Sequence, residues 1–520
     1  MADQTAVRYL AGAKAFQIGS RPALVVVVGV LATALVLGWS VLLDNPAFGL
    51  LGLAALAFTL VCLADPFWGL VVMLVQFAVL PCESTFFGYY IPNVLQAGVP
   101  VVFLFAFLSA LKDRRDLRVM PSDVLLLGLA IWGFVGLLEN NCFETYYKQY
   151  VNKMVLPMGF YYITRVVPFN ASRVRTLLRA NVVLLGVQAL LMVRQGTTGH
   201  SSIYTTHDGA ATGPFVYFWE AAPYLAMWVP LFIHAAHNAK SSSGRFFSFL
   251  GMALTVYATT LTQQRGATLA SLVCIPFCLL SRSMRPTMKT VIALGLLGYI
   301  PWSTSNLGED LLNRFDEKDE SRAAYREVGY AILRSPEWHP LAGIGFTQSH
   351  HVMRRLDKSL IADKTFFLWG RREGSVEEIA DQGKPLHNFY LSLLIEFGIV
   401  GTVFWAGLIL LIFVAIYHGY RRARDGLDVD DGLYVSLVAS LVAWGGVAYL
   451  HNIYRFEATM SMFWFVYALL VAQPGAFILN EALDRPEPGH SVALYRGPSA
   501  ASRAASSRTP SRAEEPGGSS

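Results

Sequence analysis

Four basic side chains in this sequence could bind an anion or accept a proton, and they lie either beside long apolar segments or in the long polar stretch between two of them. Arg265 stands between two apolar segments, Arg322 and Arg326 lie in the polar stretch 303–386, and His387 follows that stretch directly. The planar guanidinium of arginine suits bidentate binding of phosphate oxygens. An imidazole titrates near neutral pH and can take the proton of a hydroxyl group. These residue types therefore predict a phosphate site with a general base.

Each candidate also has a structural interpretation. Arg265 can extend its charge to the membrane surface from a helix end, and Arg322 and Arg326, four residues apart, can form one solvated helix face with nearby carboxylates. A single histidine at a helix start, such as His387, is usually structural. Glu220 lies inside an apolar segment, where a charge is costly, so it either contacts a substrate or pairs with an arginine.

Composition indicates the class of protein that must position these residues. The chain has 54% hydrophobic and 15% charged residues and a mean hydropathy of +0.44, whereas soluble domains carry about 25% charged residues. The net charge of +5 does not indicate nucleic-acid binding, because the basic residues are scattered through the loops. No cleavable signal peptide is apparent, since the first apolar run is long enough to remain as a span.

The apolar segments predict an all-α polytopic membrane protein with about 14 transmembrane helices and one large outer loop that contains helices. The segments centre on residues 23–43, 47–64, 66–81, 94–111, 123–138, 153–168, 176–194, 215–236, 246–262, 267–281, 287–302, 388–416, 432–450 and 459–480. The second and third are separated by Asp65-Pro66 alone, which predicts a tight hairpin.

The basic residues predict the orientation, because Lys and Arg concentrate in short cytoplasmic loops. With a cytoplasmic N-terminus, 24 Lys and Arg fall inside and five fall in short outer loops, while the other 12 lie in the long loop, which is exempt. Both termini are therefore predicted to be cytoplasmic. The predicted parts are the N-terminus 1–22, helices 1–11 in 23–302, the outer loop 303–386, helices 12–14 in 387–480, and a disordered tail 481–520.

Within the outer loop, Glu309 to Leu333 predicts an amphipathic helix, and the segment 340–346 predicts a turn after it. Residues 347–386 are mixed and polar and are expected to be partly irregular. His350-His351 lacks the partners of a metal site, so no metal or cofactor is expected. Cys82 and Cys142 both fall in predicted outer loops, where a disulfide is possible.

Taken together, four pieces of the sequence resemble the O-antigen ligase/O-antigen polymerase superfamily of bacterial envelope proteins. The similarity covers roughly residues 206–401 and is most specific from His387-Asn388-Phe389-Tyr390-Leu391 through Glu396-Phe397-Gly398-Ile399-Val400-Gly401. The supporting pieces are Thr262-Gln263-Gln264-Arg265-Gly266-Ala267, Arg322, and Pro340-Leu341-Ala342-Gly343-Ile344-Gly345-Phe346.

The resemblance implies a metal-independent, inverting glycosyltransferase at the periplasmic face of the bacterial inner membrane. Its donor would be a polysaccharide on undecaprenyl diphosphate, and its acceptor a glycan or lipid A-core. His387 would be the general base and Arg265 would bind the diphosphate, assisted by Arg322 or Arg326. Glu220 and Asn388 are further candidate substrate contacts, although Trp219-Glu220 departs from the family pattern, which expects an asparagine region there.

Three alternatives remain open at this point. The catalytic residues do not separate a polymerase from a ligase, because both transfer the reducing end of the same kind of donor. A polysaccharide flippase or secondary transporter would be expected to show repeats, charges along a midplane path and short outer loops. A structural envelope protein that docks a partner through its outer loop would tolerate changes at His387 and Arg265.

Overall fold

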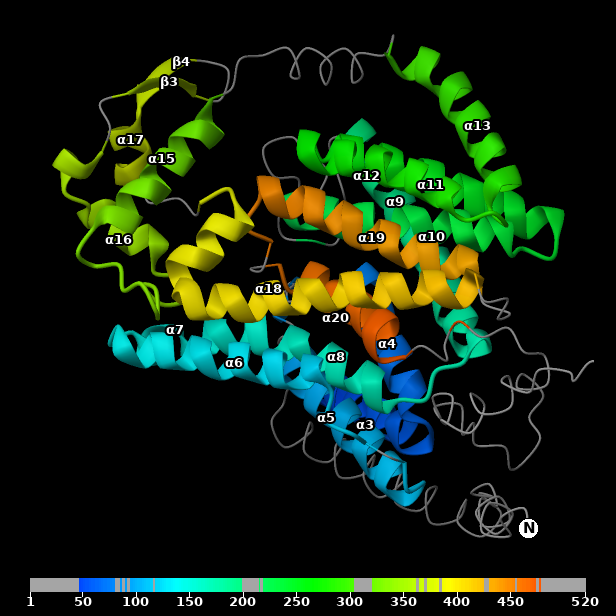
Figure 1. The fold of residues 1–520 in the computed structure, drawn as a ribbon. Coiled ribbons are helices and arrows are strands. Elements are labelled where there is room, and N and C mark those ends of the chain that lie inside the picture. Colours follow the sequence, from blue (N-terminus) through cyan, green and yellow to red (C-terminus); the bar gives the residue numbers. More distant parts are fainter. Residues whose placement is uncertain are drawn as a thin grey trace, which may run out of the picture. The chain divides into compact units, whose positions relative to one another are not determined.

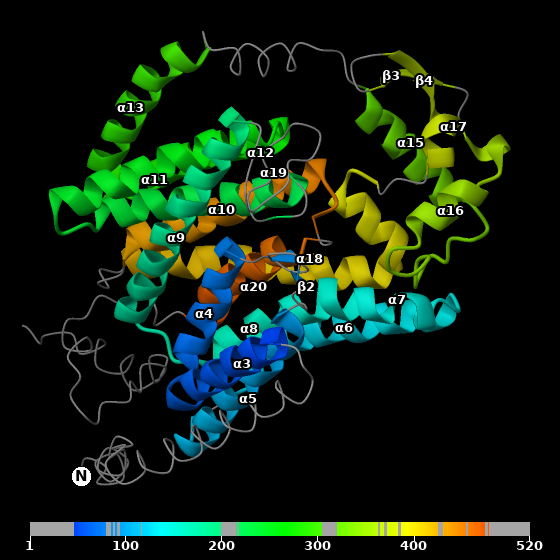
Figure 2. The ribbon, with the colours of Figure 1, turned by 180° about the vertical axis from the view of Figure 1, so that it is seen from behind.

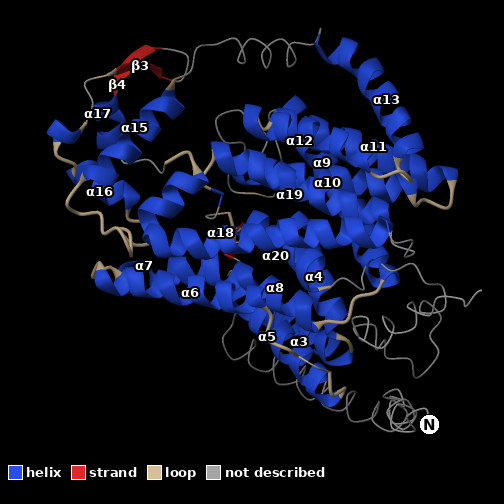
Figure 3. Cartoon of the chain, in the orientation of Figure 1, coloured by secondary structure: helices blue, strands red, loops and turns tan. Residues whose placement is uncertain are grey.

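The computed structural model is built almost entirely of helices (Figure 3). It describes residues 46–79, 85–86, 89–90, 94–115, 117–198, 215, 218–303, 320–361, 364–368, 372–382, 386–424, 430–453, 456–473 and 477. Among these residues, strands occur as two short antiparallel hairpins, β1 (Thr85–Phe86) with β2 (Tyr89–Tyr90) and β3 (Thr365–Leu368) with β4 (Arg372–Ser375). The predicted first span 23–43 and the tail 481–520 lie outside the described residues.

Every predicted span after the first contains a helix. The helices of the first half are α3 (Pro46–Ala64), α4 (Pro66–Val79), α5 (Val94–Lys112), α6 (Pro121–Glu139), α7 (Phe143–Tyr150), the π-helix η2 (Val151–Val155), α8 (Leu156–Val166), α9 (Ala171–Thr198), α10 (Phe218–His237) and α11 (Ser242–Leu261). The second half contains α12 (Arg265–Phe277), η3 (Cys278–Leu280), α13 (Arg285–Ser303), α15 (Ser321–Arg334), α16 (Ser349–Arg355), η4 (Lys358–Leu360), α17 (Val376–Gln382), α18 (Phe389–Arg424), α19 (Asp431–Leu450) and α20 (Glu457–Ala472).

Two local predictions can be compared directly with these helices. The hairpin at Asp65-Pro66 is confirmed, because α3 and α4 pack together on either side of Asp65. The sixth predicted span, 153–168, is only part of a longer helical stretch that runs from Phe143 to Val166 through the π-helical turn. Pro157 lacks an N–H donor, and the wider turn directly precedes the helix in which it lies.

Four described helices are long and apolar enough to cross a membrane: Pro121–Glu139, Ser172–Thr198, Phe389–Arg421 and Asp431–Leu450. Shorter apolar helices accompany them, among them Arg265–Leu280 and Glu457–Ala472. The helical membrane character of the protein agrees with the prediction. The count of about 14 spans and the outward position of the long loop remain predictions.

The interior is centred on α10 and α20. Side chains from Ala221 to His234 are buried all round α10, and those from Ala458 to Leu470 are buried all round α20. A helix that is apolar on every side belongs inside a protein or a membrane. Accordingly, α10 packs against α9, α11, α12, α19 and α20, and α20 packs against α8, α18 and α19 (Figures 1 and 2).

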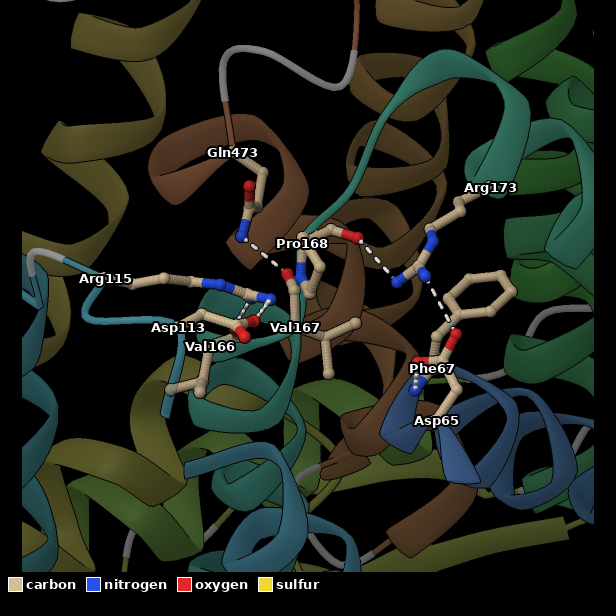
Figure 4. Close-up of polar contacts among 9 residues, drawn as sticks. All are labelled: Asp65, Phe67, Asp113, Arg115, Val166, Val167, Pro168, Arg173 and Gln473. Carbon is tan, nitrogen blue, oxygen red and sulfur yellow. Dashed lines mark hydrogen bonds and ion pairs between the residues drawn. The ribbon is translucent and has the colours of Figure 1, made fainter. Parts of the chain in front are cut away.

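Polar and charged side chains bind the backbone of the connection between α8 and α9 (Figure 4). The carbonyl of Val166 accepts from Arg115 Nη1 at 3.1 Å, and that of Pro168 accepts from Arg173 Nη1 at 3.2 Å. Arg173 also pairs with Asp65 at 2.8 Å. Gln473 Nε2 donates to the carbonyl of Val167 at 3.0 Å. Basic residues that were predicted only to orient the chain therefore also satisfy backbone acceptors.

Helix α18 is broken at Gly398, which has φ 65° and ψ −167°. A break frees backbone groups that must find other partners away from water. The segment 340–345 supplies most of them: Ile344 N donates to the carbonyl of Ile395 at 2.9 Å, and Gly345 N donates to that of Glu396 at 3.1 Å.

Two further bonds complete this pairing. The N–H of Ile399 donates to the carbonyl of Pro340 at 2.8 Å, and Trp132 Nε1 of α6 donates to the carbonyl of Phe397 at 3.1 Å. The predicted turn at 340–346 is thus a segment paired with the broken helix. It anchors the long loop, because α15, α16 and α17 share a small apolar core that includes Ile395 of α18.

Gly398 and Gly343 are required by this close approach. A Cβ on Gly398 would lie 2.2 Å from the carbonyl oxygen of Leu341, and one on Gly343 would lie 2.6 Å from the backbone of Glu396. Both glycines have positive φ, which other residues adopt only with strain.

We expect Gly398→Ala to destabilise the protein by more than roughly 1–2 kcal/mol. That amount is the cost of a positive φ for a residue with a side chain, and the added Cβ must also push the backbone of Leu341 away. Thermal unfolding of the detergent-solubilised protein would measure the loss. Gly295→Ala is the matched control, since a Cβ there meets nothing within 4 Å. Equal melting temperatures for the two variants would contradict the proposed role of the break.

Candidate functional site

Arg265 lies where α12 begins, at the C-terminal end of α19. A Cβ on Gly266 would lie 2.3 Å from Leu450 Cδ1, and one on Gly446 would lie 3.6 Å from Ala270 Cβ. The two helices therefore run antiparallel, with the start of α12 beside the end of α19. The predicted tight turn before Arg265 is confirmed, since α11 ends at Leu261 and the turn includes Gln263 in a left-handed conformation with φ 58°.

His387 is held at the same end of α19 by its neighbour Asn388. Asn388 Nδ2 donates to the carbonyl of Tyr449 at 3.1 Å, while its Oδ1 accepts from the N–H of Leu391 at 2.8 Å and caps α18. Phe389, fully buried, packs against Trp405 and against Trp444 of α19, with ring centroids 5.1 and 5.4 Å away. The start of α18 is therefore fixed to α19.

His451, the first residue after α19, joins this group. Its ring lies 5.8 Å from that of His387, and the ring of Tyr325 lies 4.6 Å from that of His387. Tyr325 comes from α15, which packs on α18 so closely that a Cβ on Gly329 would lie 2.6 Å from Leu391. The site is thus built from the starts of α12 and α18, the end of α19 and one face of α15.

The charges around His451 act on its protonation. Burial, together with electrostatic interactions with His387 and with the guanidinium of Arg322, lowers the pKa of His451 well below its ordinary value of 6.5. The imidazole is therefore neutral near pH 7. Its Nε2 is buried and makes no hydrogen bond to any of the residues that the structure describes.

The structure distinguishes the two arginines of α15. Arg322 is close enough to His451 to influence its charge, and Tyr325, one turn later, contacts His387. Arg326 lies a full turn beyond Arg322. The predicted helix is confirmed from Ser321 to Arg334, whereas its predicted beginning at Glu309 lies outside the described residues.

Glu220 lies in the first turn of α10. Because α10 and α11 are antiparallel neighbours of about equal length, the start of α10 is level with the end of α11, beside Arg265. Glu220 is therefore at the same end of the bundle as the other candidates. It is partly buried.

Glu396 has a structural environment of its own. Its carboxylate is buried and accepts from the N–H of Thr347 at 2.9 Å and from Ser349 Oγ, at the start of α16, at 2.8 Å.

The rest of the loop also has defined structure where it is described. The stretch expected to be partly irregular contains α16, α17 and a hairpin, and His351 is hydrogen-bonded to Tyr146 of α7. Cys142 is a buried free thiol, while Cys82 lies outside the described residues.

The sequence prediction missed His451 and Tyr325. His451-Asn452 repeats the dipeptide His387-Asn388 at the end of another predicted span, 432–450, and that repetition was a usable signal. Tyr325 had no distinguishing signal, because it reads as one apolar position of an amphipathic helix.

The fold and the site define a helical membrane protein with a cationic, histidine-containing site at one end of its helices. Residues 250–406 match the family model described as O-antigen ligase. The match confirms the resemblance to the O-antigen ligase/polymerase-like superfamily and points to a function of that type. It includes Arg265, Arg322, Arg326, His387 and Asn388, and it ends before His451. No curated protein matches the chain.

We expect His451 to make the stability of the protein fall as the pH drops from about 7 to 5. The unfolded chain binds a proton at His451 near its ordinary pKa of 6.5, whereas the folded chain resists it, so protonation favours unfolding. In His451→Gln, melting temperature should depend less steeply on pH over this range. The exposed His418, changed to Gln, is the control. Identical slopes for wild type and His451→Gln would contradict this assignment.

Proposed function

We propose that the protein is a membrane glycosyltransferase that polymerises or ligates undecaprenyl-diphosphate-linked polysaccharide, O-antigen or exopolysaccharide, at the periplasmic face of the bacterial inner membrane. One observation carries the proposal. Arg265, Arg322 and His387, which are far apart in the sequence, converge on the C-terminal end of α19, and all three fall within the matched region.

In this proposal the arginines bind the diphosphate of the donor. Arg265 at the start of α12 and Arg322 on α15 approach the end of α19 from two different elements. As the bond between the anomeric carbon and the diphosphate oxygen breaks, negative charge grows on that oxygen. Fixed guanidinium groups stabilise the developing charge without reorganising, so the reaction needs no metal ion.

His387 is the proposed general base. The acceptor hydroxyl loses its proton to the imidazole while its oxygen attacks the anomeric carbon from the side opposite the diphosphate, which inverts that centre. A neutral His451 beside it does not oppose the positive charge that His387 gains. Asn388 uses both ends of its side-chain amide within the protein, so we assign it to positioning His387. Glu220 stays a candidate substrate contact.

The proposed membrane arrangement is the one that the sequence predicts. About 14 spans place both termini in the cytoplasm and the loop 303–386 in the periplasm, where it covers the lipid-linked donor. Because residues 340–345 are hydrogen-bonded to the broken α18, the loop would form a fixed cover over the donor. A flippase or secondary transporter is the alternative, and it would not need a base at His387.

Deleting the gene and examining the envelope glycans would separate the two enzymatic possibilities. Long chains that stay on the carrier lipid would indicate a ligase, because the chains are made but not transferred. Single repeats in place of long chains would indicate a polymerase. Normal glycans with His387→Ala and Arg265→Ala both fully active would overturn the enzymatic proposal.

We expect Arg322→Ala to lower the transfer rate about 100- to 1,000-fold, as the loss of one stabilising donor does in other enzymes. Arg326→Ala is the matched control, since it removes the same charge one turn away and should cost much less. His387→Ala should lower the rate by about 100- to 10,000-fold. The measurement is glycan transfer by the purified variants from a lipid-linked donor. Equal losses at Arg322 and Arg326 would contradict the assignment.

A further inference from the structure

A cavity of about 790 Å³ lies between α9, the end of α10 and the start of α11, which pack side by side (Figure 2). It is separate from the proposed catalytic site. Its polar lining is at the N-terminal end of α11, whereas Arg265 follows the C-terminal end. The two regions are therefore separated by the full length of α11, whose 20 residues span about 30 Å.

One end of the cavity is positively charged. Arg175 and Arg179 lie four residues apart on one face of α9, and Lys240 lies in the turn between α10 and α11. Asn238 and Ser241 add polar groups there. None of the described residues that line the cavity is acidic. This end therefore suits an anionic group, and the two guanidiniums suit phosphate oxygens in particular.

The rest of the cavity is an apolar groove that is open along its side. From Arg175 to Leu190 it follows 16 residues of α9, a rise of about 22 Å. This exceeds the roughly 15 Å depth of one leaflet's hydrocarbon. Val183 and Val187 are 66% and 51% exposed, and Leu250 across the groove on α11 is 42% exposed. A small soluble anion would leave this apolar length uncovered.

We propose that this cavity binds one anionic phospholipid, with its phosphate at Arg175, Arg179 and Lys240 and an acyl chain along the groove between α9 and α11. Clusters of basic residues beside membrane helices are recognised by anionic lipid headgroups in this way. The proposal depends on the membrane setting of the helices and not on the catalytic assignment. In the predicted topology, the lipid belongs to the cytoplasmic leaflet.

Native mass spectrometry of the full-length, delipidated protein tests the charge requirement. The protein is offered phosphatidylglycerol and phosphatidylcholine with identical acyl chains. Wild type should retain phosphatidylglycerol about tenfold more than phosphatidylcholine, and the double variant Arg179→Gln/Lys240→Gln should lose that preference. Arg245→Gln is the matched control, because it removes an exposed cation near the cavity that does not line it.

Gly186 tests the groove independently. It lines the cavity, and a Cβ at this position meets nothing within 4 Å, so Gly186→Ala is accommodated and the side chain of Gly186→Phe begins in open space. The Phe ring should fill the groove and lower phosphatidylglycerol retention about tenfold or more, whereas Ala should leave it unchanged. Equal retention of both lipids by wild type, loss of the preference in Arg245→Gln, or full retention by Gly186→Phe would overturn the proposal. None of these readouts depends on glycan transfer.

Discussion

The break in α18 at Gly398 is the constraint on which the candidate site depends. A helix in an apolar environment can lose backbone hydrogen bonds only where other groups replace them. Here the segment 340–345 and Trp132 of α6 replace them. The same bonds that satisfy the broken helix therefore fix the long loop to the helix that begins beside His387. An uninterrupted α18 would provide no backbone partners for the loop.

The arrangement of charge follows from this attachment. The loop brings Arg322 of α15 over the end of α19, where the antiparallel packing of α12 also places Arg265. Burial of the His451 imidazole there, together with its interactions with His387 and Arg322, lowers its pKa. In the proposed function, the guanidinium groups of Arg265 and Arg322 bind the diphosphate of the donor at this end of α19.

Much of this architecture could be predicted from the sequence, because long apolar runs and turn residues act locally. The helices at 47–64 through 459–480, the turn before Arg265 and the amphipathic helix around Arg322 all follow from such signals. The break at Gly398 could not be predicted in the same way. Gly398 occurs within an apolar run that reads as one helix, and only the distant segment 340–345 makes its left-handed conformation favourable.

The same distinction applies to the site residues. Arg265 and His387 could be singled out because each is polar next to an apolar run, whereas His451 and Tyr325 act through proximity that only the fold creates. Local pattern therefore identifies the groups that carry charge, and tertiary packing selects which of them work together. Arg322 and Arg326 illustrate the point, since both are basic positions of α15 in the sequence, but it is Arg322 whose charge acts on His451. Which arginine acts on His451 thus depends on how α15 packs against α18.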